Sequence, residues 1–267
     1  MAVAKQPVSK KTTADDRKKL RRAMIAALLF LLSAAAVSAG MFFAWRALFD
    51  ANPRLVLHEI RVNGAGYWKE HPEELARKID LRTGTNLFAL DPHEIRQKII
   101  KIPNVENCSV IRVLPDTLVL KVTERVPRAK LNSPLSPWVV DGNAVIMPGM
   151  QTMKTSGTLP VIYGVSLSGV KPGTVVKGAE NAMALIMTAV RNFPDIRIHR
   201  IDMNDPKVMD IRLRYLKFPV CRVIIPVRNR GLQFMLRALQ STIINSRRTG
   251  ENKNFYDLSY DGKVVVR

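Results

Sequence analysis

The stretch NVENCSVIRVLPDTLVLKVTERVPRA, from Asn104 to Ala129, has the pattern of two strands joined by a tight turn. Apolar and β-branched residues between Val105 and Val122 supply the strands. Between them, Leu-Pro-Asp-Thr places Pro115 at the second position of a turn and Asp116 at the third, where both residue types are favoured. The sequence therefore predicts a β-hairpin.

One face of this hairpin should be buried against helices. We expect Cys108 to face the core beside Val110 as a small apolar residue, with Arg112 in the opposite phase. Val110 and Val122 would then face the helices, whereas Arg112 and Lys121 would face water.

The residues before the hairpin predict a strand and then a helix. The segment from Leu55 to Val62 alternates in polarity and ends at Asn63-Gly64, as a strand before a turn does. Pro72 then opens a helix with acidic residues in its first turn, and its buried stripe should include Leu75 and Ile79.

A second helix should begin near Asp91, because Asp-Pro-His-Glu is a helix-capping pattern. Ile95, Ile99 and Ile102 follow at helical spacing and would share one face. Together with the hairpin, these elements give the order βααββ.

This order resembles the POTRA domain of the FtsQ/DivIB cell-division family. The resemblance rests on the stretches LHEIRVNG, TGTNLFALD and IPNVENCSVIRVLPDTLVLKVTERVPRA and covers about residues 55–131. It implies a POTRA domain over residues 55–125, after a single membrane helix, and an FtsQ-type β domain over residues 126–267.

An uncharged apolar run from Met24 to Trp45 precedes that domain. As a helix it would span roughly 33 Å, close to the hydrocarbon thickness of a bilayer, so it predicts a transmembrane helix over residues 24–45. The alternative is a signal peptide, because Val37-Ser38-Ala39 has the small residues of a cleavage site. Against cleavage, the apolar run continues past Ala39.

The charge of the chain favours one orientation of this helix. The whole chain carries a formal net charge of +20, and residues 1–23 hold eight basic side chains against Asp15 and Asp16. Such a basic tail is retained in the cytoplasm by the positive-inside rule, so everything beyond Arg46 would lie outside. Together with the family resemblance, this orientation implies a single-pass type II protein of the cell inner membrane that has periplasmic C-terminal domains and is enriched at the division septum.

The second half predicts a mixed α/β domain with a mainly antiparallel sheet, so the fold class of the chain is α+β. Helices are expected over Ala182–Phe193, with Val190 on the buried side, and from about Gly231. A strand should start at 138–141, and strand-like runs follow around 198–203, 208–215 and 220–227. Residues 159–164 resemble the LP-x-apolar-x-G segment that follows the POTRA domain in the family. In the family, a glycine commonly stands where this chain has Ala144, and an arginine where it has Ser259.

No catalytic, cofactor or metal motif is evident. The four histidines are dispersed, and Cys108 and Cys221 form neither a CxxC motif nor a disulfide framework. Asp202, Asp205 and Asp210 could form an acidic pair for glycan hydrolysis, but their sequence context is that of turns and strand edges. We therefore expect no catalytic residue and no cofactor.

The closing stretch FYDLSYDGKVVVR predicts an edge strand that a partner strand could extend. Tyr256, Leu258 and Tyr260 would share one face, with a turn at Asp261-Gly262. The simpler alternative is that this face only covers the last helix. The resemblance points to the same segment, and the expected partner-binding residues are Tyr256, Leu258, Ser259, Tyr260, Lys263, Val264, Val265 and Val266.

The resemblance implies a scaffold that links division proteins at the septum, with partners similar to FtsB and FtsL. An envelope enzyme acting on cell-wall polymer is the first alternative. A POTRA-type assembly factor is disfavoured, because about 140 residues of mixed helix and strand cannot supply a long barrel. Nucleic-acid binding is also disfavoured, because aromatic residues make up only 6% of the chain and do not flank the basic clusters.

Overall fold

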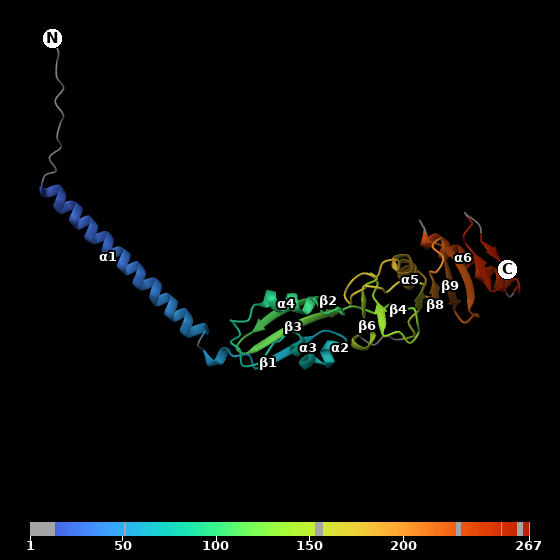
Figure 1. Cartoon of the computed structure of the whole chain (residues 1–267), viewed down its shortest axis with the longest axis horizontal. Coiled ribbons are helices and arrows are strands. Elements are labelled where there is room, and N and C mark those ends of the chain that lie inside the picture. The colour runs from blue at the N-terminus through green and yellow to red at the C-terminus, as the bar shows by residue number, and fades with distance from the viewer. Residues whose placement is uncertain are drawn as a thin grey trace, which may run out of the picture.

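The computed structural model describes residues 14–50, 52–152, 157–227, 231–251, 253–260 and 264–266. The molecule is elongated, and a long N-terminal helix leads into a first domain and then into a second (Figure 1). The first domain follows the helix directly and ends with the hairpin strands, and the second contains the rest of the chain.

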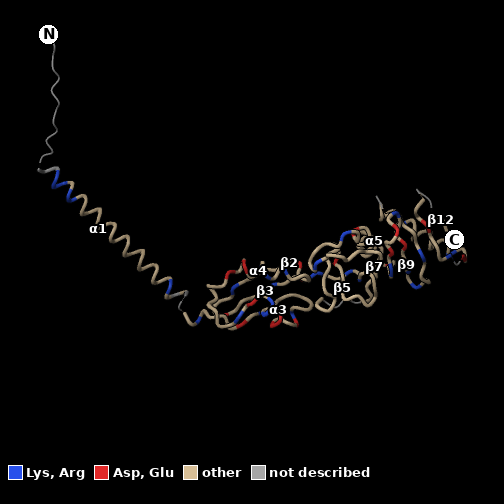
Figure 2. Tube along the Cα trace, viewed as in Figure 1, with Lys and Arg blue, Asp and Glu red and all other residues tan. Residues whose placement is uncertain are grey.

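The N-terminal helix α1 (Ala14–Trp45) is long and apolar enough to cross a membrane, and its side chains from Arg17 onward are exposed. Figure 2 shows basic residues at its start and an uncharged stretch along most of its length. The helix begins well before Met24, so part of the predicted basic tail is helical, while residues 1–13 lie outside the described residues. A short π-helix, η1 (Arg46–Asp50), continues it.

The first domain is a three-stranded sheet covered by helices on one face. Its elements after the 3-10 turn η2 (Pro53–Leu55) are β1 (Glu59–Asn63), α2 (Tyr67–Glu70), α3 (Pro72–Lys78), α4 (Pro92–Ile100), β2 (Val105–Val113) and β3 (Thr117–Glu124). The strand order is β1-β3-β2, in which β3 pairs parallel to β1 and antiparallel to β2. The predicted hairpin is confirmed, because β2 and β3 pair from Val113 opposite Thr117 back to Val105 opposite Glu124.

The expected core of this domain is also present. Ile95 and Ile99 are buried on the inner side of α4, and Ile102 is buried just after the helix ends. The Asp91 carboxylate accepts a hydrogen bond from the His93 backbone N–H at 2.9 Å. Leu75 and Ile79 are buried as well. The helical spacing in the sequence therefore identified the faces that pack on the sheet.

Two details of the first domain differ from the prediction. The first strand begins at Glu59 rather than Leu55, because Val56 makes only an isolated bridge to Asn86. The short helix α2 was not predicted, although its Trp68 is fully buried. A helix of four residues is too short to show a periodic pattern.

The predicted position of Arg112 was wrong. Arg112 lies opposite Leu118 in the hairpin and therefore on the same sheet face as Val110, which lies opposite Leu120. Its guanidinium donates a hydrogen bond to the Leu90 carbonyl and lies 5.5 Å from the ring centre of Phe88. The long side chain runs along the margin of the core and presents its charge to a carbonyl oxygen there, so it is half-buried rather than in water.

The second domain contains one nine-stranded sheet among its described residues. The strand order is β12-β11-β10-β9-β8-β7-β4-β5-β6, and five of the eight pairings are antiparallel. This confirms the mainly antiparallel sheet. The strands are β4 (Ala129–Leu131), β5 (Trp138–Val140), β6 (Ile146–Pro148), β7 (Val161–Tyr163), β8 (Ile196–Asp202), β9 (Val208–Tyr215), β10 (Cys221–Pro226), β11 (Phe255–Asp257) and β12 (Val265–Val266).

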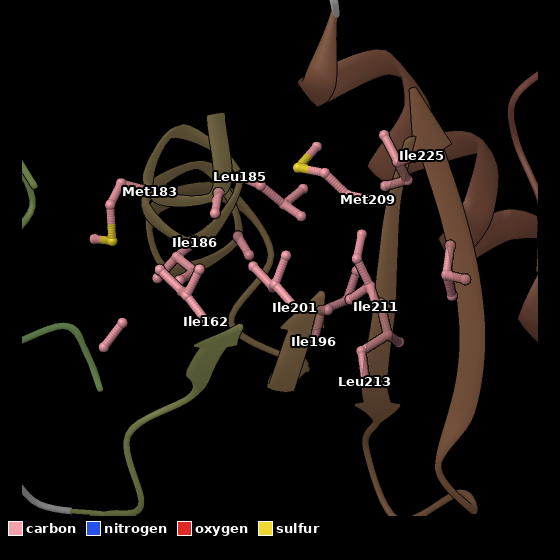
Figure 3. Packing of buried hydrophobic residues seen from close by; sticks show 14 of the residues in the cluster. Ile162, Met183, Leu185, Ile186, Ile196, Ile201, Met209, Ile211, Leu213 and Ile225 are labelled. Carbon is pink, nitrogen blue, oxygen red and sulfur yellow. The ribbon is translucent and has the colours of Figure 1, made fainter. Parts of the chain in front are cut away.

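Two helices, α5 (Glu180–Asn192) and α6 (Leu232–Arg248), pack on one face of this sheet. Figure 3 shows side chains from α5 directed at Ile162, Ile201 and other inward-facing residues of the sheet. The helix predicted over Ala182–Phe193 is confirmed, except that Val190 is exposed rather than buried. Ala144 adopts a φ of 59°, a left-handed conformation that favours glycine, which is the residue expected there from the resemblance.

A polar joint connects the two domains. The buried Glu124 carboxylate at the end of β3 accepts hydrogen bonds from the Tyr67 and Trp68 backbone N–H groups at 3.1 and 2.7 Å. Arg125 then pairs with Asp141 of the second domain at 2.8 Å. From the second domain, the 3-10 turn η3 (Gly149–Gln151) reaches back, and Gln151 contacts Glu74, Lys78 and Asn104. These contacts fix the second domain next to the open end of the hairpin, where β3 ends at Glu124.

Candidate functional site

The predicted site lies at the C-terminal edge of the nine-stranded sheet. β11 pairs parallel to β10, with Tyr256 opposite Val223, and β12 pairs antiparallel to β11, with Tyr256 opposite Val266. No strand follows β12 in the sheet within the described ranges. The order of the chain therefore places its final strand at a sheet edge.

Tyr256 and Leu258 attach this edge to the domain core. Both side chains are buried, the Tyr256 hydroxyl donates a hydrogen bond to the Lys253 carbonyl at 3.1 Å, and the Leu258 N–H donates to the Ile224 carbonyl at 2.9 Å. Burial raises the pKa of the Tyr256 hydroxyl. These two residues hold β11 in place. Because their side chains are buried, they position the edge and do not themselves offer a surface to a partner.

Tyr260 departs from the expected face. Because β11 ends at Asp257, the alternation does not continue, and the Tyr260 side chain is 59% exposed. Ser259 turns the chain here, as its N–H and hydroxyl both donate to the Asp257 carboxylate, at 2.9 and 2.6 Å. Tyr260 is therefore available at the surface, whereas Tyr256 and Leu258 are not.

The last residues of the predicted site form β12. Val264 and Val266 are partly buried and pack against the core of the second domain, and Val265 is also half-buried. Lys263 and the predicted turn at Asp261-Gly262 lie outside the described residues. The backbone N–H and C=O groups on the side of β12 away from β11 are those that an added strand would pair with.

A row of arginines next to this edge was not predicted. Arg200, Arg212 and Arg222 lie opposite one another across β8, β9 and β10, and Arg197 lies opposite Arg214. All five are exposed on the face of the sheet away from the helices. The signal was present in the sequence as arginines alternating with buried residues in IRIHRI and IRLRY, but only the strand register brings them together. We call these five residues the arginine face.

Only part of the charge on the arginine face is neutralised by neighbouring carboxylates. Asp202 pairs with Arg200 at 2.8 Å, and Asp210 pairs with Arg222 at 2.7 Å. Partial burial and then the charges of Arg214 and Arg197 lower the pKa of the neighbouring His199. Because like charges placed opposite each other destabilise a sheet, the arrangement costs stability unless an anion covers it.

The carboxylates considered for glycan hydrolysis do not form an acid and base pair. Asp202 and Asp210 lie opposite each other in β8 and β9, but each is engaged by an arginine. The hydrogen bond from Arg200 is the main cause that lowers the pKa of Asp202, whereas a general acid needs a raised one. Asp205 accepts a hydrogen bond from the Lys207 N–H in a turn. Among the described residues, no group of His, Cys, Asp and Glu could hold a metal ion.

Comparison with known proteins agrees with the fold of the first domain. Residues 56–125 match the family model described as "POTRA domain, FtsQ-type". The first domain is an FtsQ-type POTRA domain. The predicted POTRA domain is thereby confirmed. Its elements follow the predicted order βααββ, with the short helix α2 in addition.

Similar curated proteins carry related names. The chain is 30% identical over 109 residues to "Cell division protein FtsQ" of Corynebacterium glutamicum, an alignment that covers 39% of this chain and 48% of that protein. It is 24% identical over 195 residues to "Cell division protein DivIB" of Clostridium acetobutylicum, covering 72% and 76%. It is 40% identical over 57 residues to "Cell division protein FtsQ" of Syntrophotalea carbinolica, covering 21% and 20%.

The alignments to the Corynebacterium and Syntrophotalea proteins span less than two thirds of those proteins. The alignment to the Clostridium protein extends into the second domain, because it covers 72% of this chain and the POTRA match ends at residue 125 of 267.

Proposed function

We propose that this chain is a bitopic cell-division scaffold that acts by binding other proteins rather than by catalysis. The observation that carries the proposal is the FtsQ-type POTRA domain placed directly after a helix long enough to span a membrane. Cell-division relatives of both the FtsQ and DivIB type support a role in division. The helix would hold the two domains on the outer side of the inner membrane, enriched at the septum, where they would link division proteins.

The binding surface that we propose is the edge formed by β12, with Tyr260 beside it. This strand has unpaired backbone groups on one side within the described part of the sheet, and Val266 and the preceding Val264 pack against the core. A partner that adds a strand here would gain backbone hydrogen bonds without any rearrangement of the domain. Partners similar to FtsB and FtsL are the candidates that the family resemblance suggests.

The positive charge of the arginine face favours a partner that contains an acidic segment. Arg222 lies on β10, two strands from the edge, and its guanidinium is 5.7 Å from the ring centre of Phe255 on β11. A partner that pairs with β12 and continues across the sheet would pass over Arg222 and then Arg212. Carboxylates at that point would relieve the repulsion between the arginines.

A pull-down from detergent-solubilised membranes tests this function. The full chain should capture division proteins, read by mass spectrometry, and a chain that lacks residues 263–267 should lose them while remaining in the membrane. Capture of the same proteins by both chains would show that the edge is not the binding surface. Release of sugar fragments from isolated wall material, abolished by Asp210→Asn, would instead favour the envelope enzyme.

A further inference from the structure

A chain of aromatic contacts joins the end of the membrane helix to the POTRA domain. The ring centres of Trp45 and Phe49 are 4.4 Å apart, and those of Phe49 and Phe88 are 5.2 Å apart. The Asn86 side-chain amide also donates a hydrogen bond to the Phe49 carbonyl at 2.7 Å. The segment that leaves α1 is therefore held against the loop that contains Asn86 and Phe88.

The same loop lies beside the turn of the β2–β3 hairpin. The Leu57 N–H donates to the Thr85 carbonyl at 2.9 Å, and the next residue, His58, donates to the Asp116 carbonyl at 2.9 Å. Since β3 ends at the joint with the second domain, the turn lies at the opposite end of the POTRA domain, toward α1 (Figure 1). Trp45 and the turn are thus connected through ordered contacts.

Large apolar side chains are exposed at this turn. Ile111, Val113 and Leu114 are 39%, 43% and 59% exposed, although they lie within four residues of one another. Single exposed apolar residues are common on protein surfaces, but a contiguous group marks a contact site. Here the nearest apolar phase is the membrane that α1 is long enough to span, and Trp45 has the position of an interfacial aromatic anchor.

We propose that the hairpin tip, defined as Val113, Leu114 and Pro115, rests in the lipid headgroup layer of the membrane that α1 spans. This inference rests on α1 as a membrane helix, but not on the proposed partner edge. The tip gives the POTRA domain a second attachment to the lipid surface, beside the covalent one at Trp45. With both attachments in place, the domain has a fixed tilt, and the second domain projects away from the bilayer.

Single cysteines on full-length protein in lipid nanodiscs test the tip directly. Leu114→Cys is labelled with an environment-sensitive fluorophore, and the nanodiscs contain lipids with a nitroxide quencher close to the headgroup. Leu135→Cys is the matched control, since Leu135 is 92% exposed but belongs to the second domain. The native Cys108 and Cys221 are buried, and burial raises the pKa of both thiols, that of Cys221 to about 11, so little label reacts there near neutral pH.

We expect quenching at Leu114 to be at least threefold stronger than at Leu135. A label at Ser109 should be quenched only weakly, because a strand rises about 3.3 Å per residue and Ser109 lies roughly 16 Å from Leu114. Because the nanodisc contains no division protein besides this chain, the result does not depend on partner binding. Equal quenching at Leu114 and Leu135 would overturn the proposal, and so would strong quenching at both Leu114 and Ser109, since the tip would not be the deepest point.

Discussion

Arg112 illustrates why alternation alone does not place a long charged side chain. It shares its sheet face with Val110, yet its guanidinium ends at the Leu90 carbonyl and the Phe88 ring. A charged side chain was expected in water, but the arginine stem is long enough to cover apolar surface while its head meets a backbone acceptor. This contact links the hairpin to the loop that contacts the segment after α1.

Replacing Arg112 by Ala should lower the free energy of unfolding by about 1–2 kcal/mol, because a charged hydrogen bond to a carbonyl and a cation–π contact are lost. Lys121→Ala is the matched control, since Lys121 is exposed on the opposite face of the same hairpin, and it should change stability by less than about 0.5 kcal/mol. Thermal or chemical unfolding measures both. Equal losses for the two variants would contradict the position of Arg112.

Glu124 at the joint between the domains makes stability depend on pH. Burial raises the pKa of this carboxyl above its ordinary value of 4.5, although the hydrogen bonds from the Trp68 and Tyr67 N–H groups oppose the shift. The folded protein then binds this proton more tightly than the unfolded chain does. The contribution of Glu124 to stability is therefore largest at low pH. It decreases as the pH rises through 4.5 and then through the higher pKa of the folded state.

Unfolding of Glu124→Gln measures this effect. Since Gln carries no titrating group, the wild-type protein should lose stability relative to the variant between about pH 4 and pH 7. Glu106→Gln, at an exposed position on β2, should show no such trend. A wild-type protein that gains stability over Glu124→Gln in this interval would mean that the hydrogen bonds outweigh burial.

The arginine face is a property of three neighbouring strands, and it predicts a dependence of binding on charge. Arg212→Glu should weaken binding of the captured partner by about threefold to tenfold, because repulsion replaces attraction to the acidic segment that we propose. Arg237→Glu makes the same charge change on α6, which covers the other face of the sheet. If both variants bind equally well, the partner does not cross the arginine face.

The elements with long and regular patterns could be predicted from the sequence. The hairpin and helices α4, α5 and α6 each have an apolar period that local residues determine, and their bounds agree with the prediction within a few residues. The edge position of the last strand was expected as well, and β12 does lie at the end of the sheet.

The pairing of distant strands could not be predicted in this way. The parallel contacts of β10 with β11 and of β7 with β8 join segments separated by whole helices, and no local signal fixes their register. The arginine face depends on register, so it emerges only in the structure. Tyr260 was misplaced for a related reason: β11 ends at Asp257, and the hydrogen bonds from Ser259 to the Asp257 carboxylate interrupt an alternation that is continuous in the sequence.

At the scale of the whole molecule, a helix long and apolar enough to span a membrane precedes two domains in line (Figure 1), and the topology that we propose for it is testable. The chain should keep residues 24–45 and place its C-terminus outside the cytoplasm, because the basic residues precede an uncharged run of bilayer length. A reporter active only outside the cytoplasm should work when fused after Arg267. An intact mass that begins at Gly40 would show cleavage after Ala39 and contradict the anchored molecule.

We propose that β12 binds the partner through its backbone, and one substitution tests the backbone contribution alone. Val265→Pro removes an N–H donor and fixes φ, whereas Val265→Thr keeps the donor and nearly the same shape. The affinity of the full chain for its captured partner should fall at least tenfold for the Pro variant, about 1.4 kcal/mol, and remain within about twofold for the Thr variant. Unchanged affinity in a folded Val265→Pro chain would contradict strand addition at this edge.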